Sequence, residues 1–434
     1  MSQRVVLAAG LLAVVCATTA RSQSASANGI RIGEGKLHPF LEADVRYDSL
    51  VGYFGQTSGT TGAQRPSGDI VIHARPGLKF ELVSPSTAII FNGAAEYLFY
   101  TGLVSPTATR LSRWPSGLRA NVGADARFNQ DGAVEVQVGD LLVRSDRTQN
   151  PAAGIGLVSL FNDIHLALPI HPGGRALEIT PHGAWQVELF EPLVAGGTVP
   201  GCSPTDITCD PSLVSRMSYS NVNVGVNARW RFLPKTAVVV DVASDFRTYW
   251  TVDPAHPNPS ATLLRAQAGL AGLITSRLNA TLMAGYVGDL SPAATGSTNT
   301  KLHNFIANAE IGYTPNEMMK ASLGYLRTGL AVPIYGSYID DRGYLRGTLG
   351  LWAGRLTFSA QVSLDALTFS KTASNAASRT DLAFGGGASA TFAVTSWFDT
   401  SLAYAASYRS SSLSALASVN FVRHEITLRL GLHY

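Results

Sequence analysis

Residues 426–434 read Ile-Thr-Leu-Arg-Leu-Gly-Leu-His-Tyr, and this stretch decides the fold class. Its apolar residues alternate strictly with polar or small ones, which is the period of a strand with one apolar and one wet face. The sequence stops on an aromatic residue. Outer-membrane barrels commonly end this way, because their last strand closes on the first and its terminal aromatic sits at the membrane interface. The competing interpretation is a terminal strand of a soluble β-sandwich.

The same alternation recurs along the chain, most cleanly in residues 221–232, Asn-Val-Asn-Val-Gly-Val-Asn-Ala-Arg-Trp-Arg-Phe. A helix would spread such alternate residues over its whole surface, so these segments are predicted as strands. We expect about 18 of them, with 16 or 20 as the alternatives, in one all-β, antiparallel, up-and-down transmembrane barrel. The predicted spans are 39–48, 69–81, 87–100, 117–128, 133–144, 155–170, 175–189, 217–232, 236–248, 261–274, 279–289, 303–313, 318–328, 342–352, 355–367, 381–393, 397–408 and 418–434.

The composition fits a barrel with lipid outside and water inside. Hydrophobic residues make up 46% of the chain and charged residues only 15%, whereas a soluble protein carries about 25% charged residues. No stretch approaches the roughly 18 uninterrupted apolar residues of a membrane helix. The net charge of +3, with Lys and Arg spread along the chain, gives no basis for nucleic-acid binding.

The N-terminus is predicted to be a secretory signal peptide covering residues 1–27. Arg4 gives a positive start, an apolar run follows, and small residues suitable for cleavage come next. Cys16 is expected to leave with this peptide. Residues 28–434 then form a single barrel domain, because residues 28–38 are too short for a plug.

The gaps between predicted strands alternate between short and long. Short gaps such as 84–87, 129–132 and 171–174 have the Pro, Gly, Asp and Asn residues of tight turns. The long gaps are predicted at 49–68, 101–116, 190–216, 249–260, 290–302, 329–341 and 368–380. This layout is typical of outer-membrane barrels, with the long loops outside the cell. Cys202 and Cys209 lie in a long gap, and we expect them to form a disulfide at the cell surface.

Catalytic and cofactor motifs are not found. The sequence has no His-Glu-x-x-His, no Gly-x-Ser-x-Gly and no P-loop, and its nine histidines are scattered. We therefore expect no enzyme activity, no cofactor and no bound metal.

The face opposite the apolar stripes is predicted to line the lumen with charges of both signs. Such charges brace a barrel wall by pairing with one another, and they also line a passage for a hydrated solute. For any single residue we favour bracing over a specific solute contact. The candidates are Glu42, Asp44, Arg46, His73, Arg75, Lys79, Glu96, Arg229, Arg231, Asp241, Arg247, Arg265, Arg346 and Arg429. Aromatic residues near strand ends, among them Tyr97, Tyr100, Trp230 and Tyr249, are expected to form interface girdles.

Two stretches resemble a known family. Residues 38–49 read His-Pro-Phe-Leu-Glu-Ala-Asp-Val-Arg-Tyr-Asp-Ser, and residues 67–82 read Ser-Gly-Asp-Ile-Val-Ile-His-Ala-Arg-Pro-Gly-Leu-Lys-Phe-Glu-Leu. They resemble the second β-barrel porin family, whose barrels accompany exopolysaccharide synthesis and secretion. The shared elements are a Pro before the first strand, Tyr-Asp-Ser at its upper end and an Asp-led second strand with a central Pro. Leu50 stands where the family often has Asn.

The resemblance implies a bacterial outer-membrane barrel that takes part in polysaccharide export. Its expected partners are outer-membrane lipid and lipopolysaccharide, a polysaccharide polymer, periplasmic export components and the barrel-assembly machinery. Leu430, Leu432 and Tyr434 resemble the terminal signal that the assembly machinery reads. The alternatives are a general or solute-selective diffusion porin, which an inward-folding constriction would favour, and a structural barrel of a surface machine for adhesion or motility.

Overall fold

The computed structural model describes residues 29–51, 68–112, 117–146, 157–174, 176–192, 214, 216–251, 260–291, 302–332, 336–370, 379–412 and 420–434. The predicted signal peptide (1–27) and Cys202 and Cys209 lie outside these residues, so the cleavage and the disulfide remain predictions. Within the described residues, no helix is long and apolar enough to cross a membrane.

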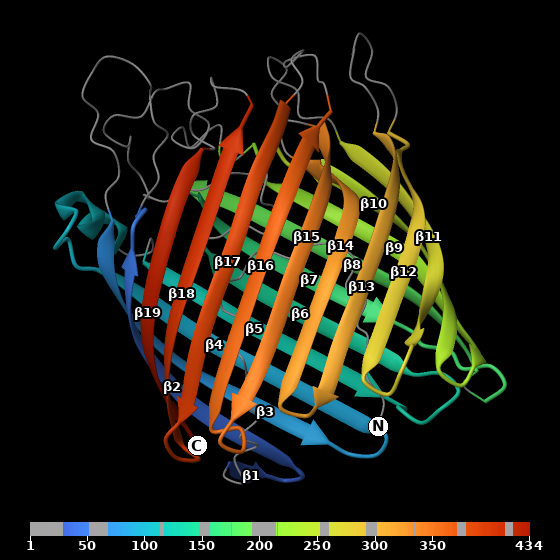
Figure 1. The fold of residues 1–434 in the computed structure, drawn as a ribbon, viewed down its shortest axis with the longest axis horizontal. Helices are drawn as coiled ribbons and strands as arrows, with labels where there is room; N and C mark the ends of the chain where they lie inside the picture. The colour runs from blue at the N-terminus through green and yellow to red at the C-terminus, as the bar shows by residue number, and fades with distance from the viewer. Residues whose placement is uncertain are drawn as a thin grey trace.

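The described chain forms one closed antiparallel sheet (Figure 1). Each long strand pairs with the strand before and after it, and the last strand, β19, pairs with β2. The long strands are β2 (Gly35–Asp48), β3 (Asp69–Val83), β4 (Thr87–Tyr100), β5 (Leu118–Phe128), β6 (Val136–Ser145), β7 (Leu157–Ala167), β8 (Leu177–Pro192), β9 (Tyr219–Leu233), β10 (Thr236–Tyr249), β11 (Ala261–Leu273), β12 (Leu278–Asp289), β13 (His303–Asn316), β14 (Met319–Val332), β15 (Gly336–Leu351), β16 (Leu356–Phe369), β17 (Arg379–Ala393), β18 (Phe398–Ser411) and β19 (Phe421–His433).

The predicted fold class is confirmed, and each predicted span corresponds to one of these strands. The described part also contains a short strand, β1 (Ile30–Ile32), which pairs with the start of β2, and a 3-10 helix, η1 (Pro106–Ser112). The sequence predicts no strand before residue 39, and this prediction was wrong. The hairpin was missed because Gly33 and Glu34 interrupt any regular alternation there.

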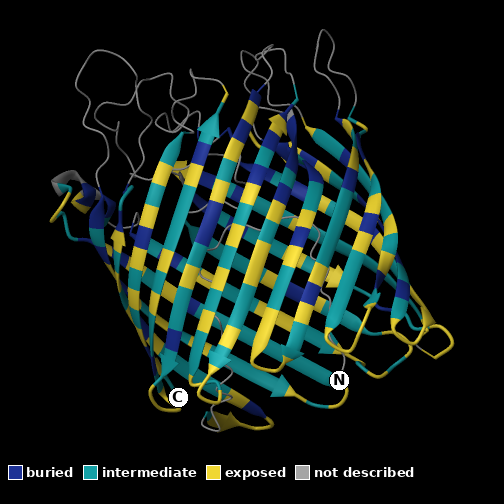
Figure 2. Cartoon of the chain, in the orientation of Figure 1, coloured by how far each residue is buried: buried dark blue, intermediate teal, exposed yellow. Residues whose placement is uncertain are grey.

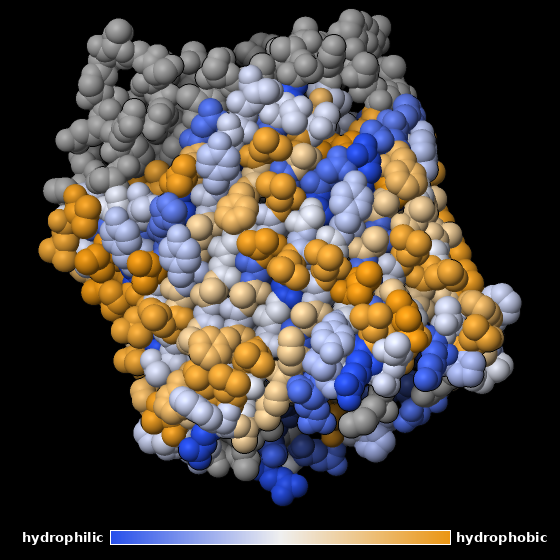
Figure 3. Space-filling view, viewed as in Figure 1, coloured by the Kyte–Doolittle hydropathy of each residue, from blue (hydrophilic) through white to orange (hydrophobic). Residues whose placement is uncertain are grey.

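The two faces of the wall differ in chemistry. Along β19 the outward residues Ile426, Leu428 and Leu430 are 49%, 51% and 47% exposed. Glu425, on the inner face of the same strand, is buried. Figure 2 shows this alternation of exposed and covered residues along the strands, and Figure 3 shows many apolar side chains on the face of the barrel that is in view. An even-numbered antiparallel barrel with an apolar exterior is the architecture of a bacterial outer-membrane protein.

The short turns lie together at the lower end of the barrel in Figure 1, on the same side as the C-terminus. They include the turn between β9 and β10 and the turn between β13 and β14. One predicted long loop, 329–341, is wrong, because β14 continues to Val332 and β15 starts at Gly336. Two of the expected girdle aromatics are also wrong: Tyr100 and Tyr249 are only 3% and 7% exposed and face inward.

Charge pairs hold the closing seam on its inner side. Arg423 of β19 donates two hydrogen bonds to Asp48 of β2, from Nε at 3.0 Å and from Nη2 at 2.5 Å. A forked guanidinium–carboxylate pair fixes both strands in register and is stronger than a single neutral bond. Arg46 lies 3.5 Å from Glu425 across the same seam. The first and last strands are therefore joined by side chains as well as by the backbone ladder.

We predict that Asp48→Asn destabilises the barrel by about 2 kcal/mol, because it removes the closer of the two carboxylates that pair with the largely covered Arg423, the other being Glu425 at 3.4 Å. The measurement is the temperature at which the folded barrel loses its faster migration on a detergent gel. Glu81→Gln is the matched control, since the Lys79–Glu81 pair is about one-third exposed and such pairs contribute about 0–1 kcal/mol. Equal transition temperatures for the two variants would contradict the proposed role of the seam.

Candidate functional site: the lumen and its constriction

The inner face of the barrel carries the charged side chains that the sequence analysis singled out. Each lies one position away from exposed apolar residues in the strand alternation, so its side chain starts on the opposite face. The structure places on this face Glu42, Asp44 and Arg46 of β2, His73, Arg75 and Lys79 of β3, Glu96 of β4, Arg229 and Arg231 of β9, Asp241 and Arg247 of β10, Arg265 of β11, Arg346 of β15 and Arg429 of β19.

A chain of alternating charges crosses four strands at the seam. Arg429 of β19 lies 3.0 Å from Glu42 of β2 and 3.2 Å from Asp399 of β18. Arg75 of β3 lies 3.0 Å from the other oxygen of Glu42. Each charge thus has an opposite neighbour on the adjacent strand, and the chain braces the wall where the barrel closes.

Asp44, His73 and Glu96 form a second group on β2, β3 and β4. His73 Nδ1 lies 3.5 Å from Asp44 Oδ1 and is hydrogen-bonded to Glu96 Oε1. Their possible metal-binding atoms lie within 4.8 Å of one another, and in the described part of the chain they are the group that meets this criterion. The contact of His73 with both carboxylates already accounts for the arrangement, and we assign no metal to it.

The remaining predicted residues pair elsewhere around the lumen. Arg265 lies 2.9 Å from Asp245, Arg231 lies 3.9 Å from Glu178, and Lys79 pairs with Glu81. Asp241 accepts a hydrogen bond from Asn227 at 3.3 Å. Arg229 stands opposite Glu178 in the β8–β9 register.

Among the predicted lumen residues that form ion pairs in the described part of the chain, Arg346 has the most exposed side chain, at 54%. It lies 2.8 Å from Glu310 of β13, which also accepts a hydrogen bond from the Tyr344 hydroxyl at 2.5 Å. The guanidinium is therefore fixed in place yet still reaches lumen water. A charge held in this way acts on the ions that pass it.

Sequence reasoning missed a buried charge cluster near the upper ends of β15 to β18. Arg342 lies 3.0 Å from Asp340 and is also bonded to Asp365, while Asp381 is bonded to Arg379 and Arg409, each at 2.6 Å. Asp340 and Arg379 fell in predicted loops, 329–341 and 368–380. The signal was present as charged residues two apart, Asp340 with Arg342 and Arg379 with Asp381.

The main departure from a regular barrel lies between β13 and β14. Their ladder ends at the pair Ala307–Arg327, although β13 begins at His303 and β14 continues to Val332. The β14–β15 ladder, in contrast, continues to Val332–Gly336. The upper part of β14 therefore parts from β13 and turns inward with the upper part of β15, which stays paired with β16 as far as Tyr338–Phe369.

This hairpin packs inside the wall. Ala331 of β14 and Ile339 of β15 form one buried apolar cluster with Leu263, Val287 and Ile306 of β11, β12 and β13. These three wall residues start on the inner face, so the hairpin covers the lumen side of three strands. We call residues 328–332 and 336–340 the inner hairpin.

Gly329 shows how closely the inner hairpin approaches the wall. A Cβ atom at this position would lie 2.8 Å from Leu302 Cδ2 and 2.9 Å from Val287 Cγ1. Such distances are below van der Waals contact, so a larger residue would have to displace the Leu302 and Val287 side chains. The inner hairpin narrows the upper part of the lumen because it occupies space inside the ring of strands.

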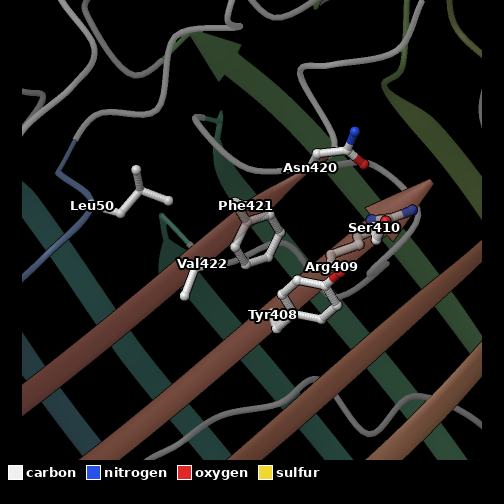
Figure 4. Close-up of a pocket in the computed structure, with 7 residues that line it drawn as sticks. All are labelled: Leu50, Tyr408, Arg409, Ser410, Asn420, Phe421 and Val422. Carbon is white, nitrogen blue, oxygen red and sulfur yellow. The ribbon is translucent and has the colours of Figure 1, made fainter. Parts of the chain in front are cut away.

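A shallow groove opens beside the upper ends of β18 and β19 (Figure 4). It is lined by Leu50, Tyr408, Arg409, Ser410, Asn420, Phe421 and Val422. Apolar and aromatic side chains make up most of the lining, so it offers few groups to a polar solute. We assign no function to it.

We predict that Arg346→Glu shifts the lumen toward cation selectivity, because it replaces a water-facing positive charge by a negative one beside Glu310. The measurement is the reversal potential of the purified barrel in planar bilayers under a KCl gradient. Leu345→Met, at the adjacent lipid-facing position, should leave the potential unchanged. An unchanged potential for Arg346→Glu in a conducting barrel would show that this side chain does not line the ion path.

No protein-family model matches the chain, and no curated protein matches it. The resemblance of residues 38–82 to the second β-barrel porin family therefore stays a prediction.

Among solved structures, the chain is similar to the outer membrane protein OpdK of Pseudomonas aeruginosa, with 11% identity, 92% of this chain and 99% of that chain covered and a TM-score of 0.45. It is similar to OccAB3 of Acinetobacter baumannii, with 11% identity, coverages of 93% and 100% and a TM-score of 0.46. It is also similar to the siderophore receptor PirA of Pseudomonas aeruginosa, with 7% identity, coverages of 91% and 80% and a TM-score of 0.44. Similarities this low carry no conclusion about the function of this chain.

Proposed function

We propose that the barrel is a passive channel for small hydrated solutes across the bacterial outer membrane. The observation that carries this proposal is the inner hairpin, which narrows a lumen lined by charges of both signs. Polar walls offer a hydrated solute partners to replace its lost water, and a narrowing sets an upper limit on its size. This is the arrangement that favours a diffusion porin over a wider conduit.

Polysaccharide export is the second candidate. The resemblance of residues 38–82 to export-associated barrels supports it, and hydrogen-bonding groups along the lumen would suit a sugar polymer. The inner hairpin counts against it, because a continuous polymer needs an unobstructed path along the whole barrel. A structural barrel of a surface machine is the third candidate. Two observations would support it: a lumen that conducts no ions, and a protein partner that stays bound to the barrel.

The surroundings of the barrel follow from its surface. We propose that outer-membrane lipid and lipopolysaccharide cover the apolar exterior. The barrel-assembly machinery would read the terminal strand through Leu430, Leu432 and Tyr434, which are 47%, 42% and 57% exposed on its outward face.

We predict that liposomes containing the purified barrel swell in monosaccharides and disaccharides but not in dextrans, because the inner hairpin limits the size of the solute. The swelling rate for each sugar is the measurement, and empty liposomes are the control. In parallel, deletion of the gene should leave secreted polysaccharide unchanged. No swelling with any sugar, combined with loss of polysaccharide secretion, would overturn the solute channel in favour of export.

A further inference from the structure

We infer that the inner hairpin is a gate that moves between its place inside the lumen and a place within the barrel wall, and that Arg247 and Arg327 hold it inside. This inference rests on the proposed channel function for its consequence, since opening the gate would widen the path for solutes. It concerns which residues set the size limit, and it does not concern what the solute is.

The β13–β14 register allows the alternative position. The ladder pairs Ala309 with Tyr325 and Ala307 with Arg327. Continued without a shift, it would place Gly329 opposite Phe305 and then Ala331 opposite His303. Both strands extend through these positions, so β14 can close onto β13 without changing the β14–β15 or the β15–β16 pairing.

The outward face of the inner hairpin suits a place in the wall as well as a place inside the lumen. Gly329, Ala331 and Ile339 continue the outward alternation that includes Leu323 and Leu345 lower down, which are 61% and 52% exposed. In the wall, these small or apolar residues would face lipid at little cost. Inside the lumen, the same residues cover Leu263, Val287 and Ile306. Covering these apolar side chains removes them from water and favours the inner position.

Arg327 stabilises the point where the strands part. Its Nε donates to Phe305 O at 3.1 Å, the carbonyl that Gly329 would face in the continued ladder, and its Nη2 donates to Asn304 Oδ1 at 3.1 Å. Its Nη1 lies 2.7 Å from both carboxylate oxygens of Asp341 on β15. The planar, multi-donor guanidinium bridges three strands at once, which a lysine ammonium on its flexible stem does poorly.

Arg247 holds the other end of the inner hairpin. Its Nη1 donates to Ala331 O at 2.6 Å, and its guanidinium lies 4.1 Å from the centre of the Tyr219 ring. Tyr219 in turn donates to Glu188 at 2.7 Å. The side chain that holds this end therefore comes from β10, which is four strands away from β14. Residues of β8 and β9 support it.

The two arginines bond to backbone groups near the point where β13 and β14 part. Arg327 reaches the backbone of β13, and Arg247 reaches the backbone of β14. An unsatisfied backbone group is costly away from water, so these side chains favour the parted arrangement. Loss of either one should shift the hairpin toward the wall.

Cysteine cross-linking tests the two positions directly. His303→Cys with Ala331→Cys places two thiols opposite each other only when the hairpin closes into the wall, where paired strand positions lie about 5.5 Å apart at Cα, a distance that a disulfide spans. Ala309→Cys with Tyr325→Cys is the positive control, since these residues are already paired on the same face. Cys202 and Cys209 are replaced by Ser in both variants, and cross-linking is followed on gels after mild oxidation.

We expect the control pair to cross-link fully and the His303–Ala331 pair to cross-link slowly. Adding Arg247→Ala should raise the rate of the slow reaction about tenfold, which corresponds to about 1.4 kcal/mol. Arg247→Lys should restore a slower rate, because its ammonium still offers a donor to Ala331 O. No cross-link between positions 303 and 331 in a barrel whose control pair reacts would overturn the gate.

Conductance of the otherwise unaltered chain separates this inference from the proposed function. Arg247→Ala and Gly329→Val, whose side chain would collide with Leu302 and Val287, should both raise single-channel conductance and admit larger sugars. Unchanged conductance and an unchanged size limit in both variants would overturn the gate while leaving a channel in place. An unmodified barrel that conducts nothing would overturn the channel, whereas cross-linking at 303 and 331 would still report the movement.

Discussion

The structure depends on one constraint, which is that the lipid interior offers no hydrogen-bond partners to a polypeptide backbone. A strand edge in lipid would leave a row of donors and acceptors unsatisfied, so the sheet must close on itself. The seam between β2 and β19 meets this requirement with a continuous ladder and with the Arg423–Asp48 fork. Where the β13–β14 ladder stops short, Arg327 bonds to the β13 backbone.

The same constraint explains why much of the fold can be predicted from sequence. A closed wall between lipid and water gives every strand an apolar and a polar face, and this requirement is local, since it appears as alternation within a single strand. Residues 221–232 and 426–434 show it without knowledge of their neighbours. Short turns rich in Gly, Pro, Asp and Asn then separate the strands, so the strand order and a strand number of about 18 follow.

The candidate site was harder to predict, because a lumen is made by residues far apart in sequence. Alternation shows that Glu42 and Arg429 face inward, but only the closed barrel brings them within 3.0 Å. The inner hairpin is reflected in the sequence by apolar residues at inward strand positions, but the alternation alone does not show what covers them. Leu263, Val287 and Ile306 are apolar residues on the inner faces of three neighbouring strands, and the inner hairpin covers them. The sequence predicts a loop over 329–341, because Gly329 and Pro333 interrupt the apolar run.

The central claim is that the upper parts of β14 and β15 lie inside the wall. Methyl NMR of the selectively labelled barrel in lipid nanodiscs tests it without changing any residue. The account predicts nuclear Overhauser effects from the methyl groups of Ala331 and Ile339 to those of Leu263, Val287 and Ile306. Effects from Ala331 and Ile339 to lipid acyl chains, with none to those three residues, would contradict it and place the hairpin in the wall.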